Sequence, residues 1–145
     1  MRKMERDDEM KKTYSTSIAL VETVADAVSI IRAALPEKQN EERVFVLPLD
    51  SCGKVLAKPI LVSVGYRDGT TAVDPKEVFK AAFKARADAI IVAHNHPSGN
   101  LTPSKADLCL TEELKSRAEW LGLEFIDHII ITSLGFSSSA EVETR

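Results

Sequence analysis

Two histidines and an aspartate in the second half of this chain have the residue types and spacing of a metal site. His94 and His96 are separated by one residue in the segment His-Asn-His-Pro-Ser-Gly, and Asp107 follows near the start of the next predicted helix. A catalytic zinc ion uses three histidine or carboxylate ligands and keeps its fourth position for water. We therefore predict that these three side chains bind zinc and leave room for chemistry.

The predicted strand ahead of the first histidine would direct both imidazoles to one side. The apolar run Ala87–Ala93 contains several β-branched residues, which predicts a buried strand that ends at His94. Proline, glycine and asparagine mark residues 95–100 as a loop. Alternate side chains of an extended segment project to the same face, so His94 and His96 should point together.

A predicted helix supplies the third ligand. Thr102 and Pro103 have the residue types of a helix N-cap and a first helical position, which places Ser104 and Asp107 in the first turns. Residues three positions apart share one face of a helix. The start of this helix should therefore present a hydroxyl and a carboxylate to the end of the strand.

This arrangement resembles the JAMM (MPN-type) zinc metallopeptidase motif, which combines an upstream glutamate, His-x-His-Pro, a serine and an aspartate. The matching residues are His94, His96, Pro97, Ser104 and Asp107. The segment His-Asn-His-Pro-Ser-Gly, with the later pattern Leu-x-Phe-x-Asp-His-Ile-Ile, resembles the RadC family in particular, over residues 42–131. The resemblance is to a short form, in which the helix-hairpin-helix segment often found ahead of the domain in RadC proteins has no counterpart.

The resemblance implies a fold and a role for each matching residue. The implied fold is a single α/β domain of JAMM/MPN-like (cytidine-deaminase-like) type, an α+β mixed sheet flanked by helices. His94, His96 and Asp107 would bind zinc, in agreement with their spacing. Glu42 would act as the general base on the zinc-activated water, and Ser104 would stabilise the oxyanion of the tetrahedral intermediate.

The upstream glutamate has two candidates. Glu42 directly precedes the apolar run Val44–Leu49 and then an aspartate, a RadC-like pattern of a glutamate before a strand that ends in Leu-Asp. Glu41 is the competing base. The chain also departs from the peptidases of the superfamily, because Asn95 stands where they usually have serine or threonine, which would allow a different substrate cleft.

Each of these residues also has a structural alternative. The histidine pair could stabilise a turn, and Glu42 could be a solvated charge at a strand edge. Ser104 could satisfy a free backbone N–H in the first turn of a helix. Asp127 and His128 project to opposite faces of a predicted strand, so both are interpreted as structural, and contact of one of them with the metal ligands is the alternative.

The rest of the pattern predicts the scaffold. Helices are expected at residues 24–35, 75–85 and 104–121, and strands at residues 44–49, 54–64, 87–93, 125–132 and 135–139. Together they predict a mixed sheet with helices packed on it. Residues 1–15 are expected to be a flexible tail, and residues 16–145 one RadC-like domain. Residues 65–71 are expected to be a flexible loop, either beside the substrate cleft or as a plain connector.

Composition predicts a soluble, cytoplasmic protein. The chain has 145 residues, 44% of them hydrophobic, which suits one domain with a core. No apolar run approaches the roughly 20 residues that span a bilayer, and the charged start lacks a secretory signal. Cys52 and Cys109 are expected to be reduced thiols, with Cys109 in the core. A net charge of -3 gives no broad basic surface for nucleic acid.

Three functional classes follow. The leading prediction is a zinc metallopeptidase of JAMM type that cleaves an amide, peptide or isopeptide bond in an unidentified peptide or protein. The second is a DNA-repair-associated RadC-like protein, which salt-dependent binding to DNA would test. The third is a non-catalytic zinc-binding module, in which a fourth protein ligand closes the site. No membrane partner is expected, and the oligomeric state is not predicted.

Overall fold

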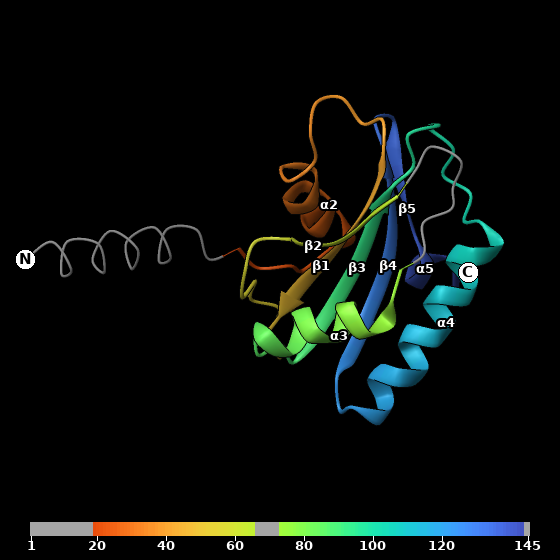
Figure 1. Ribbon diagram of the computed structural model, residues 1–145. Coiled ribbons are helices and arrows are strands. Elements are labelled where there is room, and N and C mark those ends of the chain that lie inside the picture. The colour runs from red at the N-terminus through yellow and green to blue at the C-terminus, as the bar shows by residue number, and fades with distance from the viewer. Residues whose placement is uncertain (1–18, 66–72, 144–145) are drawn as a thin grey trace, which may run out of the picture.

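The computed structural model describes residues 19–65 and 73–143, and its strands form one mixed sheet (Figure 1). The strands are β1 (Glu42–Leu49), β2 (Ile60–Gly65), β3 (Ala89–Asn95), β4 (Glu124–Thr132) and β5 (Gly135–Ser138). Their order in the sheet is β2-β1-β3-β4-β5. β3 and β4 are parallel, whereas the other neighbouring pairs are antiparallel.

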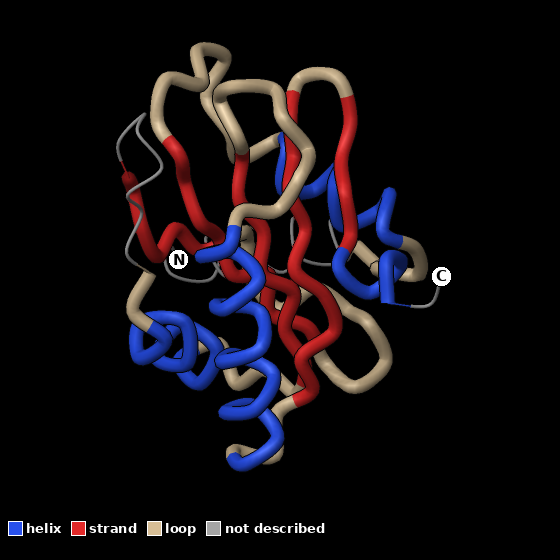
Figure 2. The backbone as a smooth tube through the Cα atoms, turned by 90° about the vertical axis from the view of Figure 1, so that its right-hand side faces the viewer, coloured by secondary structure: helices blue, strands red, loops and turns tan. Residues whose placement is uncertain are grey.

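Helices pack on both sides of this sheet (Figure 2). They are α2 (Val24–Arg32), α3 (Pro75–Lys84), α4 (Lys105–Trp120) and the short α5 (Ser139–Glu143). Val46 and Val92 belong to the hydrophobic cluster under α3 and α4, whereas Leu47 and Ile91 belong to the cluster under α2. Successive residues of the central strands therefore serve opposite faces. The predicted mixed α/β sheet flanked by helices is confirmed.

The connection from β3 through α4 to β4 determines where a site can form. Parallel neighbours need a crossover, and here a helix provides it. The carboxyl end of β3 and the amino end of α4 consequently lie at the same edge of the sheet. Because β1 is antiparallel to β3, its first residues lie at that edge too. In open α/β sheets, ligands bind at the carboxyl ends of parallel strands.

The starts of α4 and β2 differ from the predicted ones. α4 begins at Lys105, and its N-cap is Ser104 and not Thr102. The reason is a capping box, in which Ser104 and Asp107 satisfy each other's backbone N–H groups. β2 begins at Ile60 and not at Lys54, because residues 54 and 55 form isolated bridges with Leu20 and Leu49 instead.

The predicted core position of Cys109 is also wrong. α4 turns Thr111, Leu114 and Ala118 toward the sheet, and Cys109 lies on the opposite, exposed side. Cys52 is exposed as well, and both cysteines are free.

Some predictions fall on residues that the structure does not describe. The tail predicted at residues 1–15 lies outside the described residues, and so does nearly all of the loop predicted at residues 65–71. In residues 19–65 and 73–143, no helix has the length and apolar character needed to cross a membrane.

The turn before β2 provides a test of the fold. Gly53 has a φ of +88°, and an added Cβ would lie 2.9 Å from the backbone oxygen of Val21. Gly122, which follows α4, also has a positive φ, +67°, but has nothing within 4 Å of the Cβ position. Gly122→Ala should cost about 1–2 kcal/mol from backbone strain alone. Gly53→Ala should cost roughly 1–3 kcal/mol more, because the backbone at Val21 must also move.

Urea unfolding of the two variants measures this difference. Equal losses of unfolding free energy in Gly53→Ala and Gly122→Ala would contradict the close approach between Gly53 and Val21.

Candidate metal centre

Four acidic and imidazole side chains converge at the end of β3. Glu42 begins β1, His94 lies within β3, His96 follows β3, and Asp107 lies in the first turn of α4. One ligand atom from each residue lies within 4.8 Å of the others. The structure thus brings the three predicted metal ligands and the predicted base together, while their chemical roles stay predictions.

The register between two strands brings Glu42 to this point. Val44 of β1 lies opposite His94 of β3, and the strands are antiparallel. Two residues earlier on β1, Glu42 therefore comes opposite His96 and on the same face of the sheet. Glu42 is buried, with 8% of its surface exposed.

The four side chains match a zinc ion in size and donor chemistry. Glu42 Oε1 lies 3.3 Å from His94 Nε2 and 3.6 Å from His96 Nε2. Asp107 Oδ1 lies 3.3 Å from His94 Nε2, and its Oδ2 lies 3.2 Å from His96 Nε2. Four ligands held tetrahedrally at about 2.0–2.2 Å lie about 3.3–3.6 Å from one another. The observed separations between carboxylate and imidazole atoms lie in or close to this range.

His96 directs a lone pair into the centre. Its Nδ1 lies 2.6 Å from the backbone oxygen of Asn100. A carbonyl oxygen can only accept, so Nδ1 carries a proton, and the neutral ring presents a bare Nε2. That Nε2 lies 2.8 Å from His94 Nε2. Two bare nitrogens would repel each other at this distance, so the pair favours a cation, either a shared proton or a metal ion, and the adjacent carboxylates add to this preference.

Asp107 belongs to both the helix cap and the centre. Its Oδ2 accepts a hydrogen bond from the backbone N–H of Ser104 at 2.8 Å, and the same oxygen faces His96. Burial alone would raise the pKa of Asp107, but hydrogen bonds from His94 and His96 outweigh burial and hold that pKa far below its ordinary value. Asp107 is therefore a carboxylate at any pH at which the domain would bind a metal.

Ser104 is the N-cap of α4, which was its structural alternative. Its Oγ accepts a hydrogen bond from the backbone N–H of Asp107 at 3.0 Å. This contact uses an oxygen lone pair and leaves the hydroxyl proton available to donate. Capping is thus compatible with the predicted oxyanion contact, which stays a prediction.

Asn95, between the two histidines, braces the backbone on both sides of Glu42. Its side chain is fully buried, its Oδ1 accepts from the backbone N–H of Arg43 at 2.7 Å, and its Nδ2 donates to the backbone oxygen of Glu41 at 3.0 Å. Asn95 therefore belongs to the scaffold of the site and not to an exposed cleft. Glu41 itself points outward and pairs with Arg43 at 3.4 Å, so Glu42 is the glutamate in the cluster.

His128 contacts a predicted metal ligand directly. Its Nε2 lies 2.8 Å from His94 Nδ1, and its Nδ1 lies 2.6 Å from Thr111 Oγ1. Burial lowers the pKa of His128 to about 3, with a further contribution from His94, so the ring is neutral near pH 7. The structural interpretation of His128 was therefore incomplete, and sequence reasoning missed Thr111 altogether. Thr111 lies one helical turn after Asp107, which is the signal that could have identified it.

Asp127 lies on the opposite face, as its alternation with His128 predicted. Its carboxylate accepts hydrogen bonds from the hydroxyls of Ser138 and Ser139 and from the backbone N–H of Ala140. These contacts hold the start of α5 against β4, so the structural interpretation of Asp127 agrees with its contacts.

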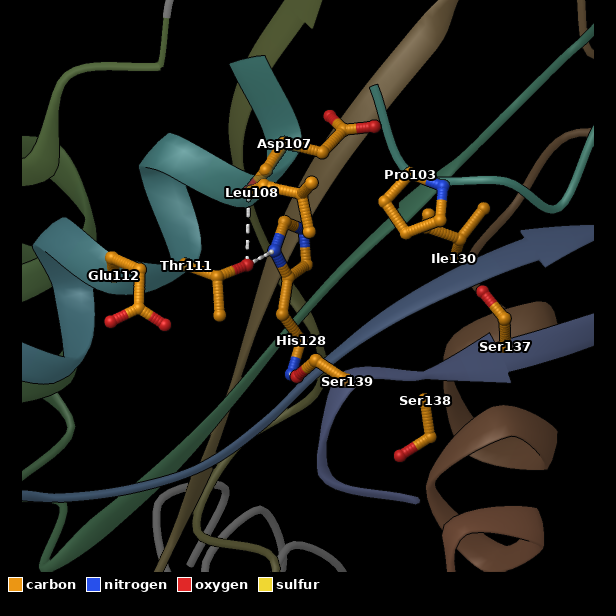
Figure 3. A pocket seen from close by; sticks show the side chains of 10 residues that line it. All are labelled: Pro103, Asp107, Leu108, Thr111, Glu112, His128, Ile130, Ser137, Ser138 and Ser139. Atoms are coloured by element: carbon orange, nitrogen blue, oxygen red, sulfur yellow. Dashed lines mark hydrogen bonds between the residues drawn. The ribbon is translucent and has the colours of Figure 1, made fainter. Parts of the chain in front are cut away.

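A pocket opens beside the cluster, between α4 and strands β4 and β5 (Figure 3). It has a volume of about 200 Å³, and Asp107 and His128 line it together with the apolar side chains of Pro103, Leu108 and Ile130. The pocket therefore places apolar surface next to a residue of the candidate metal centre.

Comparison with known proteins gives a family match over nearly the whole described chain. The RadC-like JAB domain family matches residues 21–144. A UPF0758 protein of Chlorobium chlorochromatii is 36% identical over 116 residues, which cover 80% of this chain and 51% of that protein. A UPF0758 protein of Actinobacillus pleuropneumoniae is 34% identical over 145 residues, covering 98% of this chain and 65% of that protein.

A third relative, a UPF0758 protein of Thermotoga maritima, is 42% identical over 102 residues, covering 70% of this chain and 45% of that protein. The chain thus spans roughly half to two thirds of the length of these curated relatives. Their names specify no activity.

The brace formed by Asn95 predicts a stability loss. Asn95→Asp keeps the shape and the acceptor for Arg43, but it loses the donor to the Glu41 carbonyl and places a carboxylate beside that oxygen. We expect a loss of about 1–3 kcal/mol in unfolding free energy. Asn100→Asp is the matched control, because Asn100 is exposed and its Oδ1 only accepts from Thr102. Its loss should stay within about 0.5 kcal/mol. Denaturant unfolding that gives equal values for both variants would contradict the brace.

The hydrogen bond that protonated His96 donates to Asp107 predicts how metal binding depends on pH. This bond raises the pKa of His96 above its ordinary 6.5, although burial opposes the rise. Metal binding requires the unprotonated ring, so metal affinity should fall about tenfold per pH unit below the raised pKa and level off above it.

The stability of the apoprotein should depend on pH in the opposite direction. The stabilisation from protonated His96 is complete below pH 6.5 and disappears as the pH rises through the folded-state pKa. NMR titration of the apoprotein tests this, and a His96 midpoint below 6.5 would contradict it.

Proposed function

This chain belongs to the RadC family, and from this membership we propose that it acts as a zinc-dependent hydrolase that cleaves an amide, peptide or isopeptide bond. The observation that carries the proposal is the convergence of Glu42, His94, His96 and Asp107 on one point at the edge of the sheet. Two carboxylates and two imidazole nitrogens in this space form a concentrated set of electron-pair donors, which favours a divalent cation. A bound zinc ion would act as a Lewis acid and lower the pKa of water.

In this proposal, His94, His96 and Asp107 hold the ion. Hydrogen bonds within the protein already set the orientation of each ligand. These bonds join His96 to the Asn100 carbonyl, His94 to His128, and Asp107 to the backbone N–H of Ser104. Ligands that are held in place before the ion binds lose little conformational entropy on binding. The ligand set therefore supports binding of one ion at a defined position.

Glu42 is proposed as the general base. Its Oε1 lies next to both ligand nitrogens, so it could accept a proton from the attacking water and deliver that proton to the leaving nitrogen. The neighbouring hydroxyl of Ser104 would donate a hydrogen bond to the oxygen that gains negative charge. The apolar pocket beside Asp107 would accept a side chain next to the scissile bond, which supports a peptide or protein as substrate.

The position of Glu42 also favours a second candidate function. Its Oε1 lies as close to His94 Nε2 as Asp107 Oδ1 does, at 3.3 Å. If Glu42 were a fourth ligand, it would close the site and produce a non-catalytic zinc module. Association with DNA stays a prediction, which salt-dependent binding would test.

Metal content with two substitutions distinguishes the candidates. We expect about one zinc per wild-type chain by elemental analysis. His96→Ala should lose the metal, whereas Glu42→Gln should retain it, because a base is dispensable for binding. In a screen of peptide and isopeptide substrates, Glu42→Gln should lower kcat about 10²- to 10⁴-fold.

The outcomes distinguish the hydrolase from the non-catalytic zinc module. Loss of zinc in Glu42→Gln would support the non-catalytic module and contradict the general base. Absence of zinc from reconstituted wild-type protein would contradict metal-dependent function altogether. Because Glu41 is exposed and lies outside the cluster, Glu41→Gln is the matched control and should change neither metal content nor turnover.

A further inference from the structure

We propose that His128 and Thr111 are positioning residues that fix the orientation and tautomer of His94, so that its Nε2 faces the metal without a proton. This inference rests on the proposed metal binding and adds two residues to it. Neither residue is among the four whose ligand atoms converge.

A continuous set of hydrogen bonds connects two of the proposed ligands through these residues. Figure 3 shows the two bonds that Thr111 makes, to the backbone of Asp107 and to His128. The Thr111 hydroxyl donates to the backbone oxygen of Asp107 at 2.9 Å. His128 Nδ1 lies 2.6 Å from Thr111 Oγ1, and His128 Nε2 lies 2.8 Å from His94 Nδ1. This series of hydrogen bonds therefore begins at the backbone of Asp107 and ends at the ring of His94.

The number of available protons fixes which group donates in each of these hydrogen bonds. The hydroxyl of Thr111 has one proton, and the Asp107 carbonyl can only accept it. Thr111 Oγ1 then accepts the Nδ1 proton of His128, so His128 Nε2 is bare and accepts the Nδ1 proton of His94. His94 Nε2 is consequently left with a lone pair that points at the centre. In the reverse direction, the last proton would lie on His94 Nε2, where the metal binds.

Burial makes this set of contacts difficult to replace. Thr111, His128 and His94 are 6%, 4% and 2% exposed, so bulk water has little access to their polar atoms. His128 lies on the face of β4 under α4, beside a cluster that includes Val92 and Leu114. A purely structural residue at this position could be aliphatic and would avoid the cost of burying two ring nitrogens. The contacts of both nitrogens explain why a histidine is present.

A matched pair of substitutions at Thr111 tests the proposal. Thr111→Val is nearly isosteric but removes the hydroxyl, whereas Thr111→Ser retains it. His128→Phe removes both ring nitrogens and keeps an aromatic ring. We expect zinc affinity, measured by competition with a chromophoric chelator, to fall about 10- to 100-fold in His128→Phe and about 10-fold in Thr111→Val. Thr111→Ser should restore a value close to that of the wild type.

The tautomers provide a readout that packing alone would not change. The chain has three histidines, all in this region, so ¹⁵N-histidine NMR gives one set of ring signals for each. In the zinc-loaded wild type, His94 and His128 should each be protonated at Nδ1 and bare at Nε2. In Thr111→Val, His128 should lose this preference.

Three outcomes would overturn the proposal. These are a His128 protonated at Nε2 in the zinc-loaded protein, unchanged affinity in Thr111→Val, and equal losses of affinity in Thr111→Val and Thr111→Ser. The Thr111 pair keeps the test decisive if His128→Phe does not fold. Wild-type protein that binds no zinc would instead refute the proposed function, on which this inference rests.

Discussion

The antiparallel register between β1 and β3 is the constraint on which the candidate site depends. Val44 lies opposite His94, and this pairing carries Glu42 to the position across from His96. Because side chains alternate along a strand, a slip of one residue would turn Glu42 to the opposite face and bring Glu41 toward the histidines. Asn95 opposes such a slip, since its amide accepts from Arg43 and donates to the backbone of Glu41. The identity of the acid at the centre is thus determined by pairing between strands.

How much of this could be predicted from the sequence depends on the distance over which each feature is encoded. The α3 helix was predicted to begin at residue 75, and the structure confirms this start, because Pro75 is its first residue and Asp74 its N-cap, both of them local signals. The spacing of the two histidines at the end of one strand and of Asp107 on the following helix was equally local. The N-cap of α4 was predicted two residues early, since Thr102 and Pro103 resemble a helix start, but the reciprocal hydrogen bonds between Ser104 and Asp107 define the cap.

The features that could not be predicted depend on packing between distant segments. The choice between Glu42 and Glu41 as the glutamate of the site requires the register of β1 against β3. The contacts of His128 with His94 and Thr111 require β4 to lie beside β3 while α4 packs over both. Alternation along β4 correctly placed Asp127 and His128 on opposite faces, but it could not reveal what lies on either face. Cys109 was wrongly assigned to the core, because the side of α4 that is buried depends on where the helix packs, which the sequence does not reveal.

The double use of the Asp107 carboxylate has a thermodynamic consequence. The oxygen that accepts from the Ser104 backbone also faces His96, so the first turn of α4 and the centre share one atom. Order in this turn therefore favours occupancy of the centre, and occupancy favours order in the turn by the same coupling free energy, since such linkage is reciprocal. A cation at the centre would protect the amino end of α4 against local opening, and conditions that fray this helix end would weaken retention of the cation. The extent of local opening at the amino end of α4 would therefore depend on whether the site holds a cation.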